Sequence, residues 1–217
     1  LLNRELGKLS DKPIFTPQYY SIKDFVFKYC SYQETDNITL IFQLYNVYLK
    51  INKDIKPFEF EHFIGSGEIM LFDFNDIDNY MINPNDLLSN LDKAKAIELW
   101  NPGKEKLTQK EEEYLAFFQK LPIYYNAYKE NLKKHNLAYD GMAYRELAER
   151  IKNNEDVAEK NINYVFAGFN ALSKSEEIIL NYFVNQTNSK IFWDADKAYI
   201  EDEQQEAGMF LRENFKL

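Results

Sequence analysis

Two short apolar runs near the C-terminal end of the chain interrupt the helical pattern that dominates the rest of the sequence. Residues 164–167 form the first run, which breaks at Gly168, and Ser173 with Glu176 has the spacing of a capping box that opens a helix. Residues 190–193 form the second run. Strand, helix and strand in this order are typical of a crossover unit, so we expect two buried parallel strands joined by a helix.

The N-terminal part of the chain contains two predicted helices and one predicted strand. Residues 1–9 have a helical pattern, and prolines bound residues 12–17, which favours a short extended strand. Ser21 lies three residues before Asp24, which is the spacing of a helix cap, and Phe25 begins the apolar face of the helix that follows.

Residues 35–136 show helical periodicity and no strand pattern. The period is clearest in residues 37–51. Further along, Gly65-Ser-Gly67 is expected to separate two helices, and Pro122 is expected to divide a later helix that is capped at Thr108.

The helix predicted after the glycine pair has one apolar face and several carboxylates. Met70, Phe74 and Ile77 are expected to form the apolar face, while Asp73 and Asp78 are expected to point away from it into solvent.

These elements together predict an α/β fold with a small parallel sheet. We expect residues 1–34 and 137–217 to form the α/β core and residues 35–136 to form a large all-helical insertion. Parallel strands would place a ligand at their carboxyl ends, where Asp194 follows the second strand.

The composition limits the partners. The chain has 217 residues, with 26 Lys and Arg against 35 Asp and Glu, so its net charge is −9 at pH 7. This charge repels a phosphate backbone over most of the surface, so any nucleic-acid contact has to be local. With one cysteine, no export signal and no long apolar run, we expect a cytoplasmic protein without a membrane contact. Because Leu1 opens the chain inside a helical pattern, we also expect a fragment of a longer protein.

The pair Asp194 and Asp196 raises one enzymatic possibility. It resembles the Asp-x-Asp strand end of haloacid-dehalogenase-like phosphatases, in which the first aspartate attacks phosphate and the second handles the proton. The chain departs from that pattern two residues further on, where Ala198 replaces Thr or Val. A phosphotransfer enzyme is therefore an alternative hypothesis.

One local cluster combines basic and aromatic residues in a way that suits single-stranded nucleic acid. Lys129, Lys133 and Lys134 are interleaved with tyrosines, and such a cluster can track a backbone while the rings stack on bases. An ordinary helix surface over core tyrosines explains the same pattern equally well.

The order of elements resembles the first motor domain of superfamily I helicases. Residues 15–25 resemble the threonine strand and helix that contact DNA in that family, which implies a DNA contact at Thr16. Residues 137–147 are similar to the helix that precedes the Walker B strand. Residues 164–171 and 191–197 lie where these enzymes carry Asp-Glu-x-Gln-Asp and Gly-Asp-x-x-Gln. The resemblance implies a P-loop NTPase-like core of the motor domain 1A type with a 1B-like helical insertion.

The departures from the helicase motifs imply that catalysis has been lost. Ala167 stands at the metal-binding aspartate of Walker B, Gly168 at the water-activating glutamate and Asn170 at the following glutamine. Of the third motif Asp194 remains, while Lys197 replaces the glutamine. Phosphoryl transfer needs magnesium and a positioned water, so the resemblance implies no catalytic residue, no metal and no cofactor in this chain.

Three short stretches make the resemblance more specific. AGFNALSKSE at 167–176, WDAD at 193–196 and EDEQQEAG at 201–208 look most like the inactivated helicase-like region of AddB-type helicase-nuclease proteins of Bacteroides relatives. In that family a PD-(D/E)XK nuclease domain lies far downstream, and an active motor subunit of the AddA type drives double-strand-break processing. The resemblance implies a non-catalytic scaffold in a DNA exonuclease of repair and recombination. A protein-interaction module without DNA contact is the other alternative.

Overall fold

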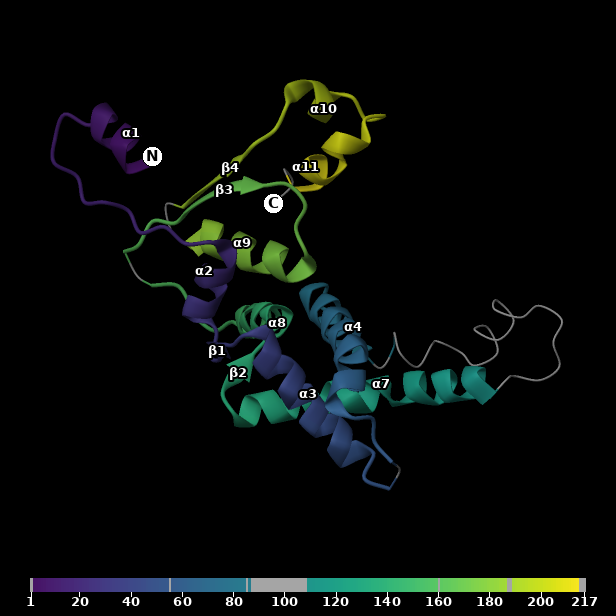
Figure 1. The fold of residues 1–217 in the computed structure, drawn as a ribbon. Coiled ribbons are helices and arrows are strands. Elements are labelled where there is room, and N and C mark those ends of the chain that lie inside the picture. Colours follow the sequence, from purple (N-terminus) through teal and green to yellow (C-terminus); the bar gives the residue numbers. More distant parts are fainter. Residues whose placement is uncertain are drawn as a thin grey trace.

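The computed structural model describes residues 2–54, 56–84, 86, 109–159, 161–186 and 189–214. These residues form an α/β fold in which helices dominate and the strands make two small parallel pairs (Figure 1). In chain order the elements are α1 (Leu2–Leu9), α2 (Ile22–Tyr29), β1 (Gln33–Glu34), α3 (Asn37–Ile51), α4 (Phe60–Asn79), α7 (Gln109–Lys134), β2 (Leu137–Ala138), α8 (Asp140–Lys152), β3 (Val165–Phe169), α9 (Lys174–Gln186), β4 (Lys190–Trp193), α10 (Lys197–Glu201), the 3-10 turn η1 (Glu206–Gly208) and α11 (Met209–Asn214).

Of the three helix caps expected from the sequence, two lie in the described residues, and both are present. The Ser21 side chain accepts a hydrogen bond from the Asp24 backbone N–H at the start of α2. At the start of α9, the Ser173 backbone N–H donates to the Glu176 carboxylate over 2.8 Å, and the Glu176 N–H donates back to the Ser173 hydroxyl. These reciprocal bonds satisfy donors that the first turn of a helix leaves unpaired.

The strand–helix–strand unit at the C-terminal end is confirmed. β3 and β4 pair in parallel and α9 connects them, as the sequence predicts. A second parallel pair, β1 with β2, joins Gln33 to Leu137 and Glu34 to Ala138. The described residues between this second pair, from 35 to 136, contain helices and no strand.

The strand predicted for residues 12–17 is wrong. Residues 13–20 form no ladder, and Phe15 is fully exposed. Pro13 and Pro17 have no backbone N–H to donate, which disfavours a paired strand at both ends of this short segment.

Helix α4 runs without a break through the glycine pair, so the predicted separation at Gly65-Ser-Gly67 is wrong. A Cβ atom on Gly67 would lie 2.8 Å from Cε1 of Phe63, a ring that is 2% exposed. Gly67 therefore makes room for a core side chain. The gain from that packing outweighs the helix propensity cost of roughly 1 kcal/mol per glycine.

Helix α7 likewise continues through Pro122, which was expected to divide it. A proline inside a helix removes one backbone hydrogen bond. The neighbouring residues Leu121, Tyr124 and Tyr125 are all buried in the core. Their burial stabilises the helix around the proline. The predicted cap at Thr108 lies outside the described residues.

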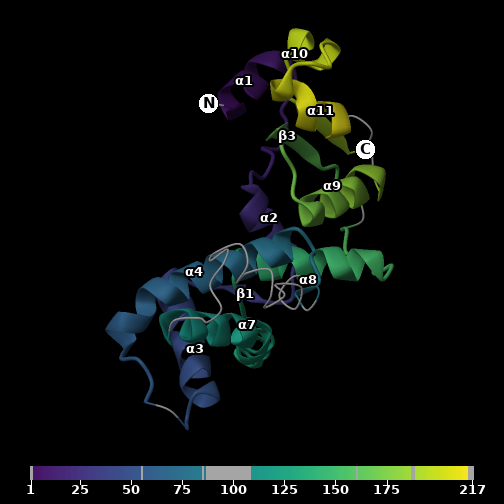
Figure 2. The ribbon, with the colours of Figure 1, turned by 90° about the vertical axis from the view of Figure 1, so that its right-hand side faces the viewer.

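A single hydrophobic core runs through the described part of the chain. Helix α4 packs against α3 and α8, and α8 packs against α9. Figure 2 shows α3, α4 and α7 at one end of the molecule and β3, α9, α10 and α11 at the other, with α2 and α8 between them. The helices of residues 35–136 and the α/β unit therefore share buried contacts. Among the described helices, none has both the length and the apolar character needed to cross a bilayer.

Candidate functional site at the ends of β3 and β4

The two long strands are in register up to an irregularity at Gly168. Phe166 pairs with Ile191 and Ala167 with Phe192, after which the register shifts. Gly168 has a φ of +84°, a conformation that side chains other than glycine rarely adopt. The glycine at the position that resembles the Walker B glutamate therefore has a backbone role of its own, which is to allow the bulge.

The two faces of this sheet differ. Phe166 is 7% exposed and its ring lies edge-on to Phe25, 5.4 Å between centroids. Helix α9 runs beneath this face (Figure 1). On the opposite face Val165 is 65% and Phe192 57% exposed, with Ala167 exposed between them. The expectation of fully buried strands thus holds for one face and is wrong for the other.

The positions that resemble Walker B lie on β3 and just after it. Ala167 and Gly168 are exposed on the strand, and they offer a methyl group and a hydrogen where magnesium chemistry needs oxygen. Asn170 follows the strand, and its carbonyl accepts a hydrogen bond from the Asn214 side chain of α11. This bond ties α11 to the carboxyl end of β3.

The acidic pair after β4 is divided between two roles. Asp194 is exposed, whereas the Asp196 carboxylate accepts a hydrogen bond of 2.8 Å from the Ala198 backbone N–H and caps α10. Lys197 is exposed and pairs with Glu201 over 3.4 Å on the same helix. Asp196 therefore has a structural task that a proton-transfer role would have to interrupt.

The short helices after β4 form a compact unit, and the contacts that hold it together were not predicted from the sequence. The Arg212 guanidinium donates to the carbonyls of Tyr199, Asp202 and Gln205 over 2.7, 3.0 and 2.9 Å. Gly208 is buried, and a Cβ there would lie 1.9 Å from the Tyr199 carbonyl oxygen. We call α10, η1 and α11 together the C-terminal unit. Gly208 and Arg212, four residues apart, form the sequence pattern that could have indicated this unit.

A buried carboxylate is the second feature that the sequence analysis missed. Asp78 of α4 is fully buried, although it was expected in solvent. Its carboxylate accepts hydrogen bonds from the Tyr125 and Tyr139 hydroxyls and binds the Lys129 ammonium at 2.9 and 3.1 Å. The Arg145 guanidinium lies 3.3 Å away. We call these five residues the Asp78 cluster.

The electrostatics of the cluster follow from burial. Desolvation lowers the pKa of Lys129, and the nearby Asp78 charge opposes that shift. Burial raises the pKa of Tyr125 and Tyr139, and the Asp78 carboxylate adds to it because a second negative charge beside it is unfavourable. The two tyrosines are thus held as neutral donors to the Asp78 side chain.

This arrangement changes the predicted basic and aromatic cluster. Lys129 is bound to Asp78, and the interleaved tyrosines Tyr124, Tyr125 and Tyr128 are buried, so their rings cannot stack on bases. Lys133 and Lys134 remain exposed at the end of α7, although Lys133 also pairs with Glu130 over 3.0 Å.

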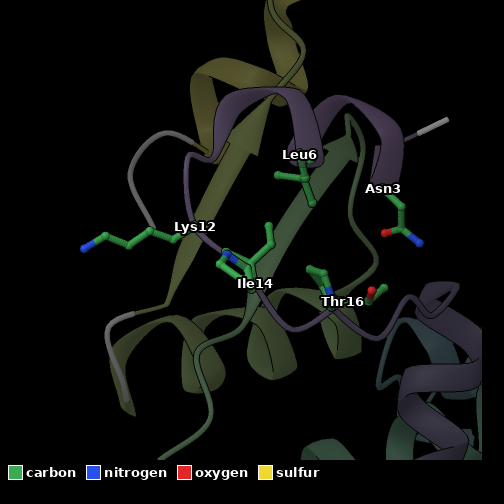
Figure 3. Close-up of a pocket in the computed structure, with 8 residues that line it drawn as sticks. Asn3, Leu6, Lys12, Ile14 and Thr16 are labelled. Atoms are coloured by element: carbon green, nitrogen blue, oxygen red, sulfur yellow. The ribbon is translucent and has the colours of Figure 1, made fainter.

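Thr16 lies in a different place, beside a hollow of about 310 Å³ between α1 and the extended segment that follows it (Figure 3). Leu6 and Ile14 point into this hollow, while the Asn3 amide and the Lys12 ammonium point away from it. The structure therefore separates Thr16 from Lys133 and Lys134 instead of gathering them into one groove.

Neither a search for metal sites nor comparison with known proteins assigns a function to this chain. Within the described part of the chain, no three His, Cys, Asp or Glu side chains are grouped closely enough to hold a metal ion. No protein-family model, curated protein or solved structure matches this chain.

Proposed function

We propose that this chain is a non-catalytic scaffold module related to the inactivated helicase-like region of AddB-type helicase-nuclease proteins. The observation that carries the proposal is the end of β3, where Ala167 and Gly168 supply no carboxylate. The resemblance to helicases aligns these two positions with the acidic residues that phosphoryl transfer requires. Gly168 in addition supports a bulge, so the position serves the backbone.

Two features of the fold support the relation to a motor domain. A parallel strand pair joined by a helix is the minimal unit of a P-loop NTPase-like core of the 1A type. The helices between β1 and β2 correspond in order to a 1B-like insertion. We propose that residues 1–34 and 137–217 are the degenerate core and residues 35–136 the insertion.

The proposed setting is DNA double-strand-break repair and recombination. In it the chain would hold an active AddA-type motor subunit and a PD-(D/E)XK exonuclease in position on a DNA end, and would itself need no cofactor. Thr16, Lys133 and Lys134 are the residues available for a DNA contact, while Lys129 is engaged by Asp78.

The test is ATP turnover by the whole 217-residue chain in the presence of magnesium, measured as the release of inorganic phosphate. We expect no turnover above buffer. Turnover that is lost on Asp194→Asn would contradict the scaffold and support the phosphotransfer alternative, in which Asp194 attacks phosphate and Asp196 moves the proton. Asp54→Asn, on the exposed loop after α3, is the matched control for a carboxylate loss.

A protein-interaction module without DNA contact is the second candidate. It is favoured by the ion pair between Lys129 and Asp78 and by the burial of the tyrosines interleaved with the lysines. A titration with a single-stranded oligonucleotide separates the two. The DNA scaffold predicts binding that weakens on Lys133→Glu with Lys134→Glu and falls steeply with salt. Equal affinity of the variant and the parent chain, or no binding at all, supports the second candidate.

A further inference from the structure

The face of the β3–β4 sheet that points away from α9 is apolar and open. Val165 and Ala167 alternate with the buried Phe166, so they lie on this face, and the pairing of Ala167 with Phe192 places the phenylalanine beside them. Val165 and Phe192 are 65% and 57% exposed. We call these three residues the open face.

Parallel strands are almost always covered on both faces, and the usual cover is a helix. Helix α9 covers one face here. Helix α1 does not cover the other, because none of its described residues is buried. In the part of the chain that the structure describes, the apolar side that a parallel sheet normally buries is therefore open to a partner.

The rim of the open face specifies the charge of that partner. Residues 194–206, which follow β4 directly, contain six carboxylates and one lysine. Asp194, Glu203 and Glu206 among them are exposed. The Asn214 bond to the Asn170 carbonyl and the Arg212 bonds to three carbonyls fix this acidic unit at the carboxyl end of the strands. Tyr199, Met209 and Phe210 add exposed apolar surface to the same unit, at 47%, 45% and 44%.

We infer that the open face binds an amphipathic helix of a protein partner, with an apolar stripe on the strands and lysines or arginines against the acidic C-terminal unit. A helix fits because it supplies the second layer that parallel strands require. Basic residues fit because complementary charge steers and orients the encounter. The inference rests on the proposed scaffold function and names the kind of segment that the scaffold holds.

The probe is a synthetic 18-residue helical peptide with leucines on one face and lysines on the other, labelled for fluorescence anisotropy and titrated with the whole chain. A second peptide keeps every leucine and replaces each lysine by glutamate. We expect the lysine peptide to bind at least tenfold more tightly, with a difference that shrinks as salt rises.

The decisive variant is Val165→Ser with Phe192→Ser, which removes the apolar contacts and leaves the buried face intact. We expect it to weaken the lysine peptide at least tenfold. The matched control is Ile69→Ser with Phe72→Ser on α4, where the side chains are 65% and 66% exposed. We expect the control to bind as the parent chain does.

Three outcomes would overturn the inference. The first is equal binding of the peptide by the Val165 and Phe192 variant and the parent chain. The second is equal binding of the lysine and glutamate peptides. The third is a dimer in sedimentation that the Val165 and Phe192 variant abolishes, because the face would then be covered by a second copy. ATP turnover tests the scaffold function separately, so a failure of either can be told from a failure of the other.

Discussion

The Asp78 cluster and the C-terminal unit place carboxylates in opposite surroundings. In the Asp78 cluster one carboxylate is fully buried and bound by two hydroxyls and two cations. In the C-terminal unit the carboxylates of Glu201, Asp202, Glu203 and Glu206 are exposed, and the Arg212 guanidinium binds backbone carbonyls. The comparison shows that a buried carboxylate stabilises the core of the helical part, whereas the carboxylates at the other end of the molecule form an acidic surface.

The largest effect expected is at the buried carboxylate. Asp78→Asn keeps the shape of the side chain, leaves Lys129 without its anion and leaves Arg145 with Glu149 alone. We therefore expect the free energy of unfolding to fall by about 3–5 kcal/mol. Urea denaturation followed by circular dichroism measures this loss. Glu68→Gln on the exposed side of the same helix is the control, with a change within about 0.5 kcal/mol. A loss below about 1 kcal/mol at Asp78 would contradict the comparison.

The two tyrosines of the cluster predict a loss of stability in alkali. Their pKa values are raised in the folded chain, so the stability they confer is complete below the unfolded pKa of about 10 and is lost as pH rises above it. Each tyrosine contributes a slope of roughly 1.4 kcal/mol per pH unit.

Urea midpoints between pH 10.5 and 11.5 measure this slope. The lowered pKa of Lys129 has the opposite effect, because the stability that it confers rises with pH. This gain is complete above the usual lysine pKa of 10.5. Tyr125→Phe should reduce the slope of stability against pH by the contribution of one tyrosine, roughly 1.4 kcal/mol per pH unit. An unchanged slope would show that Tyr125 is not held neutral in the folded chain.

A substitution in the C-terminal unit should cause local unfolding of that unit and leave the rest of the fold intact. Gly208→Ala places a methyl group against the Tyr199 carbonyl, so we expect α10 and α11 to open at least tenfold more often, seen as faster amide hydrogen exchange across residues 197–214. The urea midpoint should change little, because the core lies elsewhere. Gly7→Ala, where a Cβ meets no atom within 4 Å, is the control and should leave exchange in this unit unchanged.

The smallest effect expected is at an exposed carboxylate. Asp196→Ala removes the cap of α10 and should cost about 1 kcal/mol, confined to that helix. Exchange of the Ala198 amide, which loses its acceptor, is the measurement. A cost as large as that of Asp78→Asn would remove the distinction between the two regions.

The sequence predicted correctly those elements that depend on residues close together in the chain, which are the helix caps and the strands β3 and β4. The caps at Ser21 and Ser173 use side chains within three residues of the groups that they bind, so the spacing alone indicates them. The apolar runs of β3 and β4 are similarly local. The glycine pair in α4 and Pro122 in α7 misled the prediction because core packing, which joins distant segments, outweighs the local cost.

The Asp78 cluster was within reach of the sequence but was missed. Asp78 lies four residues after Phe74, so the helical period places it on the buried face. Tyr125 and Lys129, also four apart, form its counterpart on α7. A charge on an apolar face, together with a tyrosine and a lysine spaced to meet it, is the pattern that indicates such a cluster. The partners from Tyr139 and Arg145 depend on the tertiary fold and have no local signal.

The Asp78 cluster also decides how this protein can be shortened. Its acceptor and two of its donors come from residues 35–136, while Tyr139 and Arg145 come from the chain after β2. Excising the helical segment would remove the carboxylate that the Tyr139 hydroxyl and the Arg145 guanidinium share, and would expose a surface that is core in the whole chain. A minimal stable version must therefore keep α4, α7 and α8 together, and trimming should begin at the chain termini, outside this shared interior.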